Sequence, residues 1–136
     1  MRLTHVAVLE APPARVFAAL RDPDILKACV AGWEEFEPAG RDTYDLRFRA
    51  GSGRLEIRDA RPPSSLTLVL EGRSLGGSLR STAHVRLKEK DGGTELVAEG
   101  EARLGGLAAL LPSRRVESAA REQISGFFEK LAARLR

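Results

Sequence analysis

The chain has few of the residues on which small proteins commonly depend for covalent or catalytic chemistry. Its 136 residues include one cysteine, Cys29, which excludes an internal disulfide framework and a multi-cysteine zinc site. The two histidines, His5 and His84, lack a spaced third ligand, so the sequence predicts neither a metal ion nor another cofactor. Aromatic residues make up only 5% of the chain. Large side chains that could fill a core are therefore scarce.

Long apolar runs and a strong charge of one sign are also missing. The longest run, Gly105–Pro112, is far shorter than the ~20 residues that cross a bilayer. No signal peptide is visible, so we expect a cytoplasmic protein whose membrane contact is at most peripheral. The net charge of +3 is spread among neighbouring acidic and basic residues, which argues against a nucleic-acid partner. The length predicts a single domain over residues 1–136.

Local patterns in the first thirty residues predict one strand and two short helices. The strand candidate is Leu3–Glu10. Proline is favoured in the first turn of a helix, so Pro13 can open a helix that runs to Leu20. Asp22 then resembles an N-cap for a second helix over Asp24–Cys29.

From Trp33 the apolar period changes to two, which is typical of an antiparallel sheet with one buried and one solvated face. About six segments show it; in one of them the residues of the predicted inner face are Leu79, Ser81, Ala83, Val85 and Leu87. The C-terminal segment instead carries apolar residues at three- and four-residue steps, which predicts a long amphipathic helix from Ser113 onward. A sheet with one apolar face needs a cover, and this helix is the only element large enough.

The predicted inner face carries many small residues on its last two strands: Ser81, Ala83, Ala98, Gly100 and Ala102. Small residues on both the sheet and the helix either allow close approach or leave a hollow. We therefore expect an apolar cavity between them, unless the two phenylalanines near the C-terminus fill the space, and the sequence leaves both alternatives open. The candidate lining residues are Phe17, Leu20, Leu26, Trp33, Tyr44, Leu46, Phe48, Leu68, Ala83, Val85, Ala98, Gly100, Ala120, Ile124, Phe127 and Phe128.

Few side chains are available for acid–base or nucleophilic catalysis. His84 lies on the predicted polar face of its strand and is expected at the surface. His5 lies on a strand that is apolar on both faces, where a core histidine is a commoner outcome than a base. Cys29 is interpreted as a small buried hydrophobe. An enzymatic function would require His5, Tyr44 or Cys29 to converge in the cavity.

The stretch Arg15–Gly32 reads R-V-F-A-A-L-R-D-P-D-I-L-K-A-C-V-A-G. It resembles the motif V-W-x-x-L-x-D-P-x-x-L-x-x-C-I-P-G of the CoxG family of carbon monoxide dehydrogenase subunits, within the START-like SRPBCC superfamily. Val30-Ala31 stands where the family usually has Ile-Pro. Supporting matches are Glu71-Gly72, Gly93-Thr94-Glu95-Leu96, Gly105-Gly106-Leu107-Ala108 and Phe127-Phe128-Glu129-Lys130-Leu131.

The resemblance implies an α+β helix-grip (START-like) fold. In that fold a curved antiparallel sheet of about seven strands wraps around a long C-terminal helix, with two short helices after the first strand. It also implies a non-catalytic protein that binds an apolar molecule such as a quinone or lipid and assists a molybdenum-containing hydroxylase, with a role in membrane recruitment. Because the superfamily also contains enzymes, a polyketide cyclase or aromatase-like activity in the same cavity is the alternative.

Overall fold

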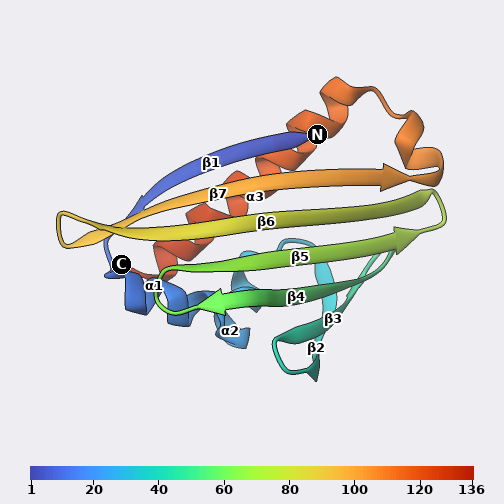
Figure 1. The fold of residues 1–136 in the computed structure, drawn as a ribbon. Coiled ribbons are helices and arrows are strands. Elements are labelled where there is room, and N and C mark those ends of the chain that lie inside the picture. Colours follow the sequence, from blue (N-terminus) through green and yellow to red (C-terminus); the bar gives the residue numbers. More distant parts are fainter.

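The computed structural model describes all residues 1–136 and contains seven strands and four helical segments (Figure 1). The strands form one antiparallel sheet in the order β1-β7-β6-β5-β4-β3-β2. This confirms the predicted α+β helix-grip class. The elements are β1 (Arg2–Leu9), α1 (Pro13–Leu20), α2 (Pro23–Cys29), β2 (Trp33–Gly40), β3 (Thr43–Phe48), β4 (Gly51–Arg61), β5 (Ser65–Ser74), β6 (Gly77–Lys90), β7 (Gly93–Gly105), the 3-10 helix η1 (Gly106–Leu110) and α3 (Ser113–Arg134).

The helix starts follow the local signals in the sequence. Pro13 occupies the first turn of α1. The Asp22 carboxylate accepts a hydrogen bond from the backbone N–H of Asp24 at 2.9 Å and caps α2, which begins at Pro23, one residue earlier than predicted. Pro112 precedes α3 and separates it from η1, because proline cannot continue a helix from the preceding turn.

The hairpin between β6 and β7 is the longest in the sheet and closes through two residues. Asp91 and Gly92 both have positive φ, 52° and 82°, as a type I′ turn requires. The two strands then pair without a register shift from Lys90–Gly93 to Ser78–Gly105. The turn therefore sets a register that brings the small inner residues of both strands side by side.

The outer face of the sheet is polar and is covered by ion pairs between neighbouring strands. Arg54 binds Asp45 at 2.8 Å, Arg86 binds Glu99 at 2.6 Å, and Arg80 pairs with Glu71. Each of these side chains is about half exposed, so the pairs contribute little to stability and chiefly keep this face solvated.

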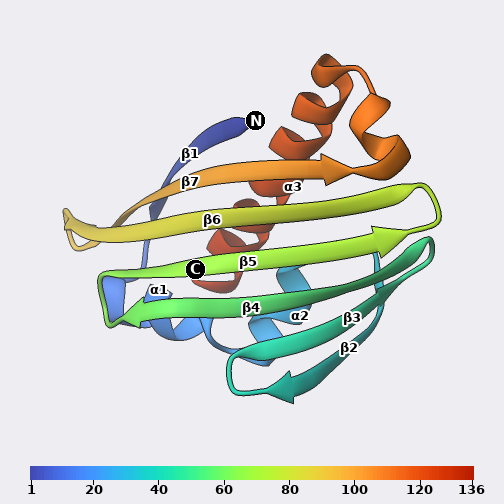
Figure 2. The same cartoon turned by 45° about the vertical axis from the view of Figure 1, so that its right-hand side comes forward.

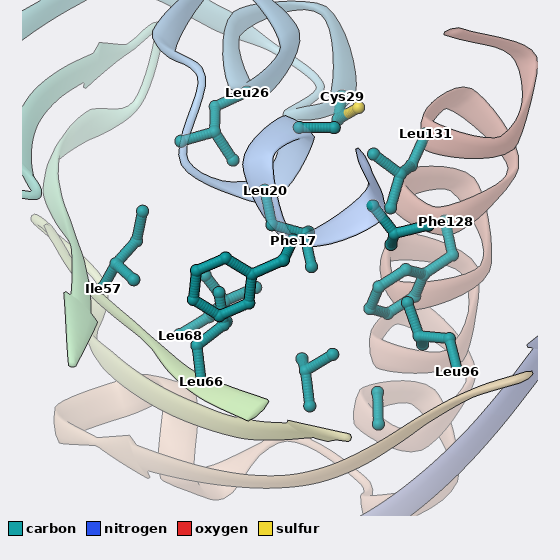
Figure 3. Packing of buried hydrophobic residues seen from close by; sticks show 14 of the residues in the cluster. Phe17, Leu20, Leu26, Cys29, Ile57, Leu66, Leu68, Leu96, Phe128 and Leu131 are labelled. Atoms are coloured by element: carbon teal, nitrogen blue, oxygen red, sulfur yellow. The ribbon is translucent and has the colours of Figure 1, made fainter. Parts of the chain in front are cut away.

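The core lies at one end of the space between sheet and α3, where α1 and α2 close the fold (Figure 2). Figure 3 shows Phe17 and Leu20 of α1 between sheet residues and the α3 residues Phe128 and Leu131. Within α3 only these last two are buried, and both belong to its C-terminal half. The fold therefore has a closed end, packed around α1 and α2, and an open end beneath the N-terminal half of α3.

Candidate ligand pocket

A pocket of about 270 Å³ lies at the open end and communicates with solvent. Its walls come from the inner faces and ends of β3 to β7, from η1, and from Gln123 on α3. The apolar side chains that line it are Phe48, Ala50, Leu70, Leu79, Leu104 and Ala108. Six polar residues also line it, Ser52, Glu71, Arg73, Ser74, Ser78 and Gln123, but most of its exposed wall is apolar, which is the chemistry of a site for an apolar molecule.

Close backbone approaches build one wall of the pocket. A Cβ atom at Gly51 would lie 1.9 Å from the carbonyl oxygen of Arg73, so only glycine fits where β4 meets β5. Gly77 has a φ of +146°, and a Cβ there would lie 2.3 Å from the carbonyl oxygen of Gly105. The Ala108 N–H donates to the Gly76 carbonyl at 2.9 Å and so fastens η1 to the β5–β6 turn. Closely packed backbone therefore forms this part of the wall.

Four exposed leucines lie within three residues of the pocket-lining Ser74 or Ala108 along the chain, and we call them the leucine rim: Leu75, Leu107, Leu110 and Leu111. Leu75 lies in the β5–β6 turn and is fully exposed, while Leu107 and Leu110 in η1 are 67% and 79% exposed. Single exposed leucines are ordinary, but a group of them beside an apolar pocket marks a surface suited to apolar contact.

The structure divides the predicted lining residues between the core and its margin. Nine are buried together in the core cluster: Phe17, Leu20, Leu26, Tyr44, Leu46, Leu68, Val85, Ala98 and Phe128. Seven are half-buried, at the edge of that core or beyond it: Trp33, Phe48, Ala83, Gly100, Ala120, Ile124 and Phe127. Phe48 alone of the sixteen also lines the pocket at the open end.

The two phenylalanines of α3 pack in and against the core at its border with the open end. Phe128 is buried and stacks on the His5 ring, with centroids 5.3 Å apart and planes 12° apart. Phe127 packs edge-on against it at 5.1 Å. Next to them Gly100 faces the Ile124 side chain. The hollow therefore begins beyond these rings, toward the N-terminus of α3.

Five apolar residues of the pocket wall were not predicted from the sequence: Ala50, Leu70, Leu79, Leu104 and Ala108. The strand alternation already placed Leu79 and Leu104 on the inner face, and they are direct cross-strand partners. The missing information was which end of the sheet α3 covers closely. That depends on the helix crossing angle, which a single sequence does not encode as a pattern.

The three candidate acid–base residues lie in or against the core cluster and not in the pocket. Burial raises the pKa of the Cys29 thiol, and nearby Arg134 and Lys130 only partly oppose this, so the thiol stays neutral at pH 7. Burial and the Asp42 carboxylate likewise raise the pKa of the Tyr44 phenol. His5 is half-buried against Phe128. No side-chain hydrogen bond joins any two of these three residues, and none of them lines the pocket.

Other polar residues singled out in the sequence have structural roles. His84 is exposed on the outer face, as its alternation predicts, and its Nδ1 lies 3.0 Å from the Thr67 hydroxyl. The Trp33 indole N–H donates to the Lys27 carbonyl at 2.7 Å. No group of three or more His, Cys, Asp or Glu residues is arranged to hold a metal ion.

Comparison with known proteins gives the family. The family model that describes the CoxG subunits of carbon monoxide dehydrogenase matches residues 7–136. The chain belongs to the CoxG family. CoxG is a family of accessory subunits, and the match covers nearly the whole chain, including the pocket. No curated protein matches the chain. None of its helices is both long and apolar enough to cross a membrane.

Solved structures show the same fold. A conserved protein from Geobacillus kaustophilus is 25% identical, with a TM-score of 0.91 over 99% of this chain and 95% of its own. An uncharacterised protein from Rhizobium leguminosarum is 19% identical, with a TM-score of 0.78 over 99% of this chain and 93% of its own. Ara h 8.0201 is 12% identical, with a TM-score of 0.75 over 99% of this chain and 97% of its own. The helix-grip architecture is thus retained at low identity.

Proposed function

We propose that this CoxG-family chain is a non-catalytic protein that holds an apolar small molecule of the quinone or lipid class. The observation that carries the proposal is the pocket at the open end. Its apolar wall is formed by Phe48, Leu70, Leu79 and Leu104. Sites of this kind bind chiefly by removing apolar surface from water, and a few polar groups set orientation. Gln123 on the pocket wall supplies an amide that can donate to a carbonyl oxygen of the ligand.

The size of the pocket limits what it can enclose. A volume of about 270 Å³ equals that of roughly nine water molecules at ~30 Å³ each. It is near the lower end of ligand pockets, which begin at about 300 Å³. The pocket therefore holds one part of a longer molecule, a ring or a chain segment, while the remainder extends out of the open mouth.

Family membership supports a role beside a larger enzyme. We infer that the chain assists a molybdenum-containing hydroxylase of the carbon monoxide dehydrogenase type, since the family is named for a subunit of carbon monoxide dehydrogenase. The leucine rim gives such a partner an apolar surface next to the pocket, so that a ligand could pass between the two proteins without crossing water. Co-elution of the purified chain with the hydroxylase from the same organism tests this role; separate elution at micromolar concentrations contradicts it.

Ligand binding is tested by thermal unfolding in the presence of quinones, fatty acids and polyaromatic compounds. A ligand at 100 times its dissociation constant stabilises the folded state by about 2.7 kcal/mol, which for 136 residues raises Tm by roughly 9 °C. Leu79→Arg places a charge in the apolar wall and should abolish the shift, because an apolar ligand would have to displace the water around the guanidinium.

Leu75→Arg is the matched control. It makes the same replacement at a fully exposed position of the leucine rim that does not line the pocket, so the ligand-induced shift should persist. Both positions lie outside the buried core cluster, so both variants should fold. The proposal fails if no compound class raises Tm, or if the two variants respond alike.

A further inference from the structure

The sheet has two edges, and they differ in how they are protected. The strand order leaves β1 at one edge and β2 at the other, each with one unpaired side (Figures 1 and 2). An unpaired strand side exposes backbone donors and acceptors to which another strand can add, and proteins usually block such edges with proline, bulges or charge.

The β2 edge carries all three protections. Its register with β3 shifts twice, between Trp33 and Glu35 and between Pro38 and Gly40. Pro38 itself removes a backbone donor. The strand also presents exposed glutamates, including Glu35 and Glu37. Addition of a further strand to β2 is therefore disfavoured.

The β1 edge has neither a proline nor a register shift, and Arg2 at its start is its only Arg, Lys, Asp or Glu. It pairs with β7 over all eight residues from Arg2 to Leu9. Met1 and Ala102 exchange both backbone hydrogen bonds, at 3.4 and 3.0 Å. Because hydrogen-bonded pairs alternate along an antiparallel ladder, the N–H and C=O groups of the even-numbered residues of β1 point away from β7, toward the open side.

The side chains of those even-numbered residues are apolar in the middle and charged at the ends. Val6 and Val8 are 57% and 67% exposed on the outer face. Arg2 begins the strand and Glu10 follows it directly, and both are exposed. Neither takes part in any of the nine ion pairs of the chain, although most outer-face charges elsewhere on the sheet are paired.

We propose that the open side of β1 pairs with β1 of a second copy of this chain. In an antiparallel pairing about a two-fold axis through Val6, Val6 faces its counterpart and Arg2 of each copy faces Glu10 of the other. All the outward backbone groups of the even-numbered residues then find partners. The same surface is used twice, as a two-fold dimer requires, and the two unpaired charges become two ion pairs. The two seven-stranded sheets form one continuous sheet.

The dimer is expected to be weak. A contact between two eight-residue strands belongs to the class of small interfaces, below about 1,200 Å², so we expect dissociation at micromolar concentrations. Analytical ultracentrifugation over a concentration series from about 1 to 500 μM measures the monomer–dimer equilibrium and its dissociation constant. Val6→Lys should weaken it more than about tenfold, because two ammonium groups then face each other on the axis.

A charge exchange tests the register. Arg2→Glu places like charges opposite each other at both ends of the paired strands and should weaken the dimer, and Glu10→Arg should do the same. The double variant Arg2→Glu/Glu10→Arg restores the opposite charges and should recover the native dissociation constant, which a loss of folding would not allow. Circular dichroism checks that each variant is folded.

Leu75→Lys is the matched control for Val6→Lys, since it adds the same charge at another exposed apolar residue, in the β5–β6 turn. It should leave the dimer unchanged. The proposal is overturned if the chain is monomeric throughout the concentration range, or if Leu75→Lys dissociates the dimer as Val6→Lys does. It is also overturned if the double charge variant stays as weak as the single ones.

Discussion

The division of the fold into a closed and an open end makes a quantitative prediction for two leucine-to-alanine variants. Leu131 has no exposed surface and projects from α3 into the space beside Cys29 of α2 (Figure 3). Truncating a fully buried leucine costs about 2–5 kcal/mol, the transfer free energy of the lost carbons plus the cavity left behind. Leu107 in η1 is 67% exposed, and its truncation should change the free energy of unfolding by less than about 0.5 kcal/mol.

These costs convert into separable melting temperatures. With an unfolding entropy of about 2.1 cal/mol/K per residue, a loss of about 3 kcal/mol lowers Tm by roughly 10 °C in a chain of 136 residues. The exposed variant should move Tm by less than about 2 °C. Thermal and urea unfolding followed by circular dichroism measure both, and urea slopes that match those of the native chain exclude a change in the unfolded state. Equal losses in Leu131→Ala and Leu107→Ala would refute the closed-end account of stability.

Glycine contacts and buried titratable groups support two more predictions. Gly100→Ala should stabilise the chain by about 0.5–1 kcal/mol, because the new Cβ would lie 3.6 Å from Ile124 in ordinary contact; Gly93→Ala should destabilise it, because its Cβ would lie 2.3 Å from the carbonyl oxygen of Leu9. Urea unfolding compares the two, and the account fails if Gly93→Ala is the more stable. Folding raises the pKa values of Cys29 and Tyr44 above 9.0 and 10.0, so both contribute stability below those values that is lost as pH rises through the folded-state pKa. The free energy of unfolding should decline above about pH 9, and a Cys29→Ala/Tyr44→Phe variant should decline less.

Most of the fold could be predicted because its signals are local. Strict alternation indicated the inner face of the sheet, Asp22 marked the start of α2, and Pro112 marked the start of α3. Element boundaries shifted by only a residue or so, as at β1, which the sequence placed one residue late at both ends. Such signals depend on spacing and cap chemistry within a few residues, so a single sequence contains them.

The pocket was harder to place because it depends on long-range geometry. The sequence indicated small inner residues such as Ala83 and Gly100 and suggested a hollow beside them. The structure places both beside the core and locates the pocket farther along, around Leu79 and Leu104. The direction in which α3 crosses the sheet decides which end is filled, and Phe128 fills one end by stacking on His5. Neither contact has a sequence spacing that predicts it.

The pairing of β1 with β7 also has a consequence during synthesis on the ribosome. Arg2 pairs with Glu101, so β1 has no partner strand until almost a hundred further residues have been translated. At about 5–20 residues per second this takes roughly 5–20 s, during which the hairpins from β2 to β6 can already form. Throughout that interval both sides of β1 are unpaired and its valines have no cover. The nascent chain is therefore most prone to association at its first strand, and completion of β7 ends that exposure on one side only.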